Sequence, residues 1–156
     1  MQTQHRHNMR PAMQMNAERT IGRPAIEVAE FFFDASNNPK WQYGMVSCQW
    51  VSDPPIAVGS TYEQLARFMG RDVKSTFVVT DFEPGRMIRI ETIESTFPIQ
   101  VERRVEPVGD TSSRVLADIT GGPEKGVMKM LSPLMAGRAQ KSVDADYDRL
   151  VQLLES

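Results

Sequence analysis

One stretch near the end of the chain decides the fold: residues 123–156 read PEKGVMKMLSPLMAGRAQKSVDADYDRLVQLLES. Apolar side chains recur in it at steps of three or four, the spacing that places them on one face of a helix. They are Met128, Leu131, Met135, Ala139, Val143, Tyr147, Leu150 and Leu154. A helix this long, in a chain of 156 residues, has to lie across a sheet to bury that face. The stretch therefore predicts a sheet and a long closing helix that together can enclose a cavity.

Two residues interrupt this predicted helix. Pro133 and Gly137 lie within the apolar stripe. A proline inside a helix removes a backbone hydrogen bond and costs about 3 kcal/mol unless the helix bends or restarts. We therefore expect a kink within residues 131–137. It would separate a Met-rich section from a second section, residues 143–154, that holds the sheet.

The rest of the chain supplies the sheet. Alternating apolar and polar residues predict a first strand over residues 12–20. After Pro24, a helix to about Ala35 is predicted, with Ile26, Ala29, Phe32 and Phe33 on one apolar face. A second short helical piece is expected around Trp41. Six runs rich in Val, Ile, Thr and aromatic residues then predict strands at residues 45–53, 60–69, 71–82, 87–95, 97–106 and 114–120.

Short turns separate these runs, so neighbouring strands are predicted to pair antiparallel. The fold class is therefore α+β, with helices on one face of the sheet. We expect a curved, seven-stranded antiparallel sheet wrapped around the closing helix, and two short helices after the first strand.

Length, charge and cysteine content limit the classes of protein to consider. We expect a flexible leader at residues 1–10 and a single domain at residues 11–156. The net charge of −2 offers no basic field for nucleic acid. No apolar run approaches the roughly 20 residues that span a bilayer, so we expect no stable membrane insertion. Cys48 is the only cysteine, which excludes an internal disulfide and favours a cytoplasmic location.

The sequence carries no catalytic signature. Its only histidines, His5 and His7, lie in the predicted leader, so the predicted domain has no histidine for general-base catalysis or for a histidine-based zinc site. Cys48 has no neighbouring basic residue that would favour a thiolate, and we interpret it as a buried apolar side chain. We expect no metal site and no cofactor.

Four short segments, taken in order, resemble one known family. They are Asn38-Pro39-Lys40-Trp41, Val58-Gly59-Ser60-Thr61-Tyr62, Phe82-Glu83-Pro84-Gly85-Arg86 and Leu150-Val151-Gln152-Leu153-Leu154-Glu155. Over residues 13–155 their order and spacing resemble the SRPBCC superfamily of START-type, or helix-grip, proteins, which includes polyketide cyclase/dehydratases and lipid-transfer proteins. The resemblance implies the helix-grip fold and a deep cavity between sheet and long helix that receives apolar or polycyclic small molecules. It assigns no catalytic role to any residue, because members of this superfamily range from binding proteins to enzymes.

Candidate ligand-binding residues are the aromatic, methionine and inward-facing polar side chains that would line such a cavity. They are Trp41, Tyr43, Tyr62, Gln64, Phe68, Phe97, Arg103, Met128, Leu131 and Met135. For each apolar member the alternative is an ordinary place in the core. Tyr43, Gln64 and Arg103 would orient the polar atoms of the ligand.

Arg103 is the most unusual of these candidates. It shares strand parity with Ile99 and Val101, which places it on the inner face of the sheet if the register holds. A buried guanidinium needs a carboxylate partner or an anionic ligand. Glu94 or Asp118 could supply the carboxylate. The alternative is that Arg103 lies at the end of the sheet with its charged head in water.

Three functions are compatible with these observations. The leading hypothesis is binding of an apolar or aromatic small molecule, lipid-like or polyketide-like. The second is a cyclase or dehydratase that folds a reactive chain, with Arg103 and Tyr62 stabilising an enolate-like oxygen. The third is a protein-interaction module or homodimer that uses sheet edges or the segment Met128–Met135. Titratable side chains in the cavity would favour the second hypothesis, and the oligomeric state tests the third.

Overall fold

The computed structural model describes residues 13–68, 70–95, 98–121 and 133–156, apart from the side chains of Phe68 and of residues 133–135. Strand β1 (Met13–Ile21) is followed by helix α2 (Ala25–Phe32) and the 3-10 helix η1 (Ala35–Lys40). Six strands come next: β2 (Met45–Trp50), β3 (Thr61–Phe68), β4 (Arg71–Glu83), β5 (Met87–Glu94), β6 (Ile99–Pro107) and β7 (Ser113–Gly121). Helix α3 (Pro133–Glu155) closes the order.

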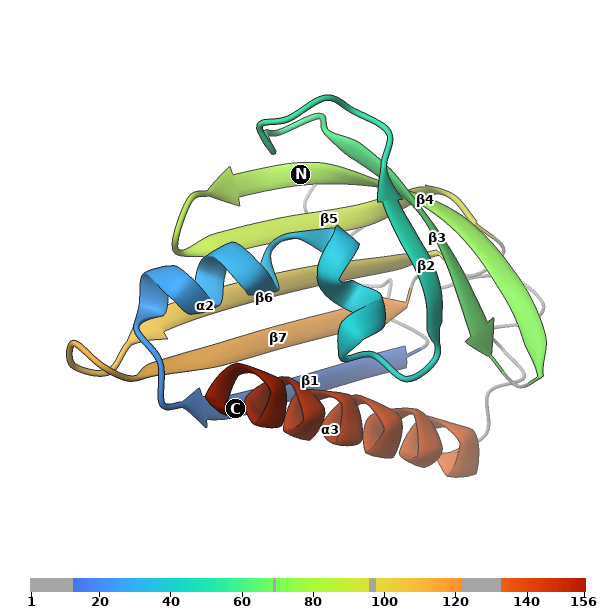
Figure 1. Cartoon of the computed structure of the whole chain (residues 1–156). Coiled ribbons are helices and arrows are strands. Elements are labelled where there is room, and N and C mark those ends of the chain that lie inside the picture. Colours follow the sequence, from blue (N-terminus) through green and yellow to red (C-terminus); the bar gives the residue numbers. More distant parts are fainter. Residues whose placement is uncertain (1–12, 69, 96–97, 122–132) are drawn as a thin grey trace, which may run out of the picture.

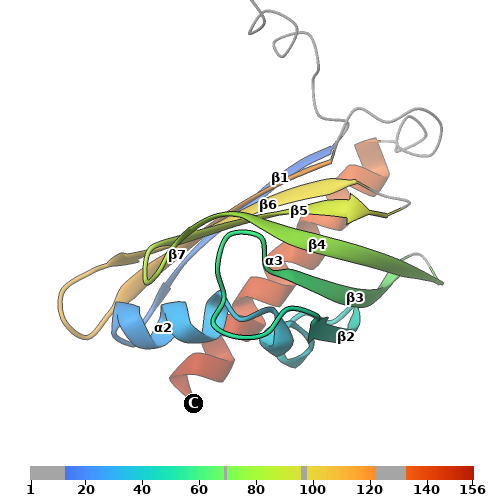
Figure 2. The same cartoon turned by 90° about the horizontal axis from the view of Figure 1, so that it is seen from above.

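The strands form one curved antiparallel sheet of seven strands in the order β1-β7-β6-β5-β4-β3-β2. Strands β1 and β2 are therefore its two edges. Helices α2 and α3 lie on the same side of the sheet, which we call the inner face (Figures 1 and 2). The predicted α+β fold class, with a seven-stranded antiparallel sheet and a helix on its concave side, is confirmed.

The two short helices close one end of the inner face. Helix α2 turns Val28, Ala29 and Phe32 towards the sheet, and all three are buried. Ile26 was predicted to share this face, but it is 67% exposed because it lies to the side of the stripe that the buried residues form. The side chain of Asp34 then caps η1 by accepting the Ser36 N–H at 3.0 Å.

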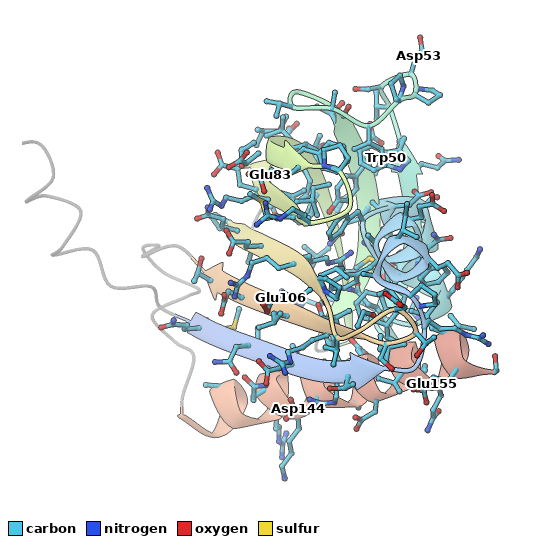
Figure 3. The ribbon with its side chains drawn as sticks, turned by 90° about the vertical axis from the view of Figure 1, so that its left-hand side faces the viewer. Trp50, Asp53, Glu83, Glu106, Asp144 and Glu155 are labelled. Carbon is cyan, nitrogen blue, oxygen red and sulfur yellow. The ribbon has the colours of Figure 1, made fainter. Side chains whose placement is uncertain are left out.

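Helix α3 is held by β1 and by the segment that follows η1. On the β1 side, the Arg19 Nε donates to the Asp148 carboxylate at 2.8 Å. On the other side, the Arg149 Nη1 donates to the Trp41 carbonyl at 2.9 Å. At its C-terminal end, Glu155 accepts the Gly22 N–H at 2.8 Å, beside the start of α2 (Figure 3). These contacts place the buried side of α3 across the open side of the sheet.

The second section of the closing helix packs as predicted, since Tyr147 and Leu150 are buried and Val143 and Leu154 are partly buried against the core. In the predicted Met-rich segment Met128–Met135, residues 128–132 lie outside the described residues. The expected kink at residues 131–137 is described only from Pro133, which is the first residue of α3. Gly137 lies within α3. None of the described helices is long and apolar enough to cross a membrane.

Candidate functional site

The inner face of the sheet differs in burial between its two ends. Ile21, Val105 and Val115, beside α2, are at most 3% exposed. At the opposite end, Thr92 and Ile99 are only partly buried, and so is Ile119. We call these three residues the open end of the inner face. Helix α3 lies against β1, α2 against β6 and β7, and η1 against β2, so the described helices leave the open end partly exposed.

Arg103 lies on the inner face between these two ends. Its position on β6 is opposite Ile88 of β5 and Ala117 of β7, and Ala117 is opposite Ala17 of β1. The two alanines are small enough to leave room for a guanidinium beneath α3. The residue is 5% exposed. The predicted inner-face position is therefore correct, and the alternative of a solvated head group is wrong because α2, η1 and α3 cover it.

The Arg103 guanidinium is held by neutral groups. Its Nη1 donates to the Phe32 carbonyl at 2.8 Å and to the Asn38 Oδ1 at 3.0 Å. It also donates to the Tyr147 hydroxyl. The rings of Phe32 and Trp41 lie against it, with centroids 5.0 Å and 5.1 Å from its central carbon. Its Nε is buried and has no hydrogen-bond partner in the described part of the chain.

No ion pair among the described residues includes Arg103. Asp118, a predicted carboxylate partner, lies on the outer face and pairs with Arg104 at 3.5 Å. Glu94, the other predicted partner, is exposed. Both predictions are wrong for the same reason: each carboxylate lies where it can be solvated, whereas Arg103 lies under three helices. The inner face therefore holds a buried positive charge without a protein counter-charge in the described residues.

A chain of weak polar contacts leads from Arg103 to β3. The Asn38 Nδ2 lies 3.8 Å from the Cys48 Sγ, and the Cys48 Sγ lies 3.9 Å from the Gln64 Oε1. Burial raises the pKa of the Cys48 thiol to about 11, so the thiol stays protonated at neutral pH. This agrees with its interpretation as a buried side chain rather than a nucleophile.

Two buried tyrosines whose pKa values the Arg103 charge affects are also neutral. Burial raises the pKa of Tyr62, and it raises the pKa of Tyr147 to about 12, although the Arg103 charge acts in the opposite direction on both. The pKa of Asp34 shifts in the opposite direction. Burial acts to raise its pKa, but hydrogen bonds from Ser36 and Trp50 outweigh burial and lower it. At neutral pH the polar cluster of Arg103, Tyr62 and Tyr147 therefore has a positive charge and hydroxyl groups that can donate hydrogen bonds to a ligand oxygen.

The structure brings together several of the predicted site residues. Trp41 and Tyr62 are buried, Gln64 is partly buried and Arg103 is buried, all on or against the inner face. Phe97, Met128 and Leu131 lie outside the described residues. Phe68 and Met135 are described only by their backbone, in β3 and α3.

Tyr43 was predicted to orient a ligand, and this prediction is wrong. Its side chain is 88% exposed. The Tyr43 N–H donates to the Asp146 carboxylate at 3.0 Å, and its ring lies 5.6 Å from the Arg149 guanidinium. The physical reason is its place in the chain, between η1 and β2, where the backbone passes along the outer surface of α3. Tyr43 helps to hold α3 instead.

Asn38 and Tyr147 belong to the site but were missed by sequence reasoning. Asn38 is only 2% exposed and orients Arg103, yet an asparagine before Pro39 is typical of an exposed turn. Tyr147 was placed in the apolar stripe of the closing helix, where periodicity gives no sign that its hydroxyl meets a charge. One feature of the sequence could have pointed to them. The strand parity of Arg103 places its charge on the inner face, and a buried charge needs polar partners, which can come from any part of the chain.

Two surface hollows are bounded by described residues. One, of about 350 Å³, lies beside Glu18, Arg104 and Asp118 on β1, β6 and β7. The other, of about 290 Å³, lies beside Glu63, Lys74 and Glu94 on β3, β4 and β5. Both are formed mainly by side chains of the outer face, so neither is the predicted cavity between the sheet and α3.

Solved structures share this fold. A protein from Thermus thermophilus has a TM-score of 0.75 and 18% identity over 90% of this chain and 96% of its own. The ZhuI aromatase/cyclase of a Streptomyces species has a TM-score of 0.74 and 16% identity, covering 95% and 94% of the two chains. A START superfamily protein from Mycobacterium smegmatis has a TM-score of 0.72 and 14% identity, covering 91% and 97%. At these identities the likeness concerns the fold.

None of the curated proteins matches the chain significantly. The sequence profile of one family does match: that of the polyketide cyclase/dehydrase and lipid transport proteins, over residues 12–155. This match covers nearly the whole chain and agrees with the START-type fold of the solved structures. The chain therefore belongs to the polyketide cyclase/dehydrase and lipid transport family.

Proposed function

We propose that the protein binds an apolar or aromatic small molecule, lipid-like or polyketide-like, between the inner face of the sheet and α3. One observation carries the proposal: Ile99 and Ile119 are only partly buried at the open end of the concave face, whereas Ile21, Val105 and Val115 at its other end are buried. Apolar surface on the concave side of a sheet, next to a few buried polar groups, is typical of a small-molecule site. The family description, which joins polyketide cyclases and lipid transport proteins, supports the same ligand class.

Aromatic rings continue the inner face beside the open end. Phe77 pairs with Thr92 across β4 and β5, and Tyr62 pairs with Phe77 across β3 and β4. The rings of Tyr62 and Phe77 are stacked, with centroids 5.1 Å apart. Trp50 meets Tyr62 edge-on at 5.2 Å. A wall of rings of this kind suits a flat or flexible apolar ligand.

Thermal-shift and native mass spectrometry experiments with fatty acids and fused-ring aromatic compounds test this proposal. A ligand at 100 times its dissociation constant should stabilise the protein by about 2.7 kcal/mol. Ile99→Trp should fill the open end and weaken binding at least about tenfold, because the ligand and the new ring compete for one space.

Gln100→Trp is the matched control, since Gln100 is the next residue on β6 and is exposed on the outer face. It should leave binding unchanged. If no compound binds, or if the two tryptophan variants weaken binding equally, the proposed site is wrong.

A cyclase or dehydratase activity is a second candidate, favoured by the hydrogen-bond donors of Arg103, Tyr62 and Tyr147 around one region of the inner face. Such donors stabilise an enolate-like oxygen. The reaction also needs a group that accepts a proton, and the raised pKa values of the thiol and phenols in the described cluster make them poor bases at neutral pH. Incubation with a model β-polyketone, followed by the absorbance of the aromatic product, tests for turnover. Binding without turnover would leave the first proposal alone.

A further inference from the structure

We propose that the site selects apolar ligands that carry a carboxylate, and that Arg103 binds this carboxylate. This inference rests on the proposed function and names the ligand chemistry of the same site. It starts from the placement of the arginines. Several of those near the surface have acidic partners: Arg19 with Asp148 at 2.8 Å, Arg67 with Asp72 at 3.1 Å and Arg149 with Asp146 at 2.9 Å. Arg103 is buried, and no carboxylate of the described chain pairs with it.

The next arginine along the strand forms ion pairs at the surface, as is usual for an arginine. Arg104 follows Arg103 on β6 but points to the outer face, where it pairs with Glu102 at 3.4 Å and Asp118 at 3.5 Å. Water competes for those surface charges, so each ion pair there contributes little. Arg103 is nearly free of water, where an uncompensated charge is costly and an added negative charge gains most. The position of the unpaired charge is therefore the one at which an acidic ligand would be bound most strongly.

The hydrogen bonds of Arg103 leave a donor for the ligand. The Phe32 carbonyl and the Asn38 side chain accept hydrogen bonds from Nη1, and the Tyr147 hydroxyl accepts a further bond from the guanidinium. The Nε–H has no partner among the described residues. A guanidinium binds a carboxylate through parallel N–H groups, and Nε–H is one of those groups. Phe32, Asn38 and Tyr147 hold the guanidinium in place, so little conformational entropy is lost when a ligand binds.

The site also fits the length of an apolar acid. Ile99 and Arg103 are four residues apart on β6, about 13 Å along a strand, with Val101 between them on the inner face. A fatty chain or a fused-ring aromatic skeleton spans this distance. The apolar part would then lie over Val101 and the open end, and the carboxylate would lie at Arg103.

Matched acids and esters test the inference. One pair is a long-chain fatty acid and its methyl ester, and the other is a fused-ring aromatic carboxylic acid and its methyl ester, which separates a lipid source from an aromatic one. Each acid should bind at least about tenfold more tightly than its ester, as expected for a hydrogen bond to a charged group. Arg103→Gln should remove this preference. Arg104→Gln, on the outer face of the same strand, should retain it.

A spectroscopic measurement keeps the test valid if Arg103→Gln folds poorly. In protein labelled with ¹⁵N-arginine, the Nε–H resonance of Arg103, assigned by its loss in Arg103→Lys, should shift with the acid and not with the ester. A water molecule at Nε instead of a ligand carboxylate would leave the resonance unchanged in both titrations, and this result would overturn the inference.

The outcomes separate the two proposals. Equal affinities for acid and ester, or a preference that survives in Arg103→Gln, overturn the role of Arg103 and leave binding of an apolar molecule intact. If neither member of either pair binds, the proposed function is wrong, and the inference is wrong with it.

Discussion

Leu150 of α3 has no exposed surface and packs among the core residues of the inner face. Replacing such a leucine with alanine removes buried apolar surface and leaves a cavity. Leu150→Ala should therefore lower the free energy of unfolding by about 2 to 5 kcal/mol. Leu153, on the same helix, is 39% exposed. Leu153→Ala is the control and should change stability by less than about 0.5 kcal/mol. Urea denaturation of the two variants measures the difference, and equal losses would contradict the packing of α3 described above.

Other single residues were harder to predict, and Arg103 shows why. Strand parity was enough to place it on the inner face, because side chains alternate along a strand whatever the strand packs against. Its partners could not be predicted. Phe32, Asn38 and Tyr147 come from three other elements, and only the packing of those elements over β6 brings them to the guanidinium.

At the scale of elements, the structure confirms one half of the predicted closing helix and leaves most of the other half untested. The section that holds the sheet is confirmed by the burial of Tyr147 and Leu150. Residues 128–132 of the Met-rich segment lie outside the described residues, and its role in the ligand site stays a prediction. Gly137, which was expected near a kink, offers a test of the helix that is described.

Gly137 lies in α3, and apart from its chain neighbours and the backbone of its own helix no heavy atom lies within 4 Å of the position that a β-carbon would take there, so an alanine side chain meets open space. Gly137→Ala should raise the free energy of unfolding by about 0.5 to 1 kcal/mol, because alanine loses less backbone entropy in a helix. Gly85 is the contrasting position, since its φ of +81° suits glycine at the β4–β5 hairpin. Gly85→Ala should destabilise the protein. Thermal unfolding of both variants checks the signs, and a loss of stability in Gly137→Ala would show that α3 is not a regular helix at this point.

For the whole molecule, the buried tyrosines predict a loss of stability at high pH. The unfolded chain ionises its phenols near pH 10, whereas the folded protein keeps Tyr147 protonated to about pH 12 and also raises the pKa of Tyr62. Stability should therefore be unaffected by these groups below about pH 9 and should fall as the pH rises from about 10 to about 12. Urea midpoints between pH 8 and pH 11 measure this effect. Tyr147→Phe should reduce the decrease, and an unchanged midpoint up to pH 11 in the native chain would contradict the burial of both phenols.

The sequence by itself determined the elements, their order and the fold class. Local periodicity and turn residues were sufficient for this, because helices and strands repeat at different spacings and short turns force antiparallel neighbours. The small errors concern helix faces and ends: Ile26 lies to the side of the buried stripe of α2, and Ala35 starts η1 instead of ending α2.

Only the tertiary structure decided which side chains meet. Tyr43 is outside because the chain passes along α3 at that point, Asp118 pairs with Arg104 across the outer face, and Arg103 is left with neutral partners under α2, η1 and α3. The physical reason is that these contacts join residues distant in the chain, so they depend on how the helices pack on the curved sheet. The local sequence indicates which face each residue occupies, whereas the meeting of two faces depends on the whole fold.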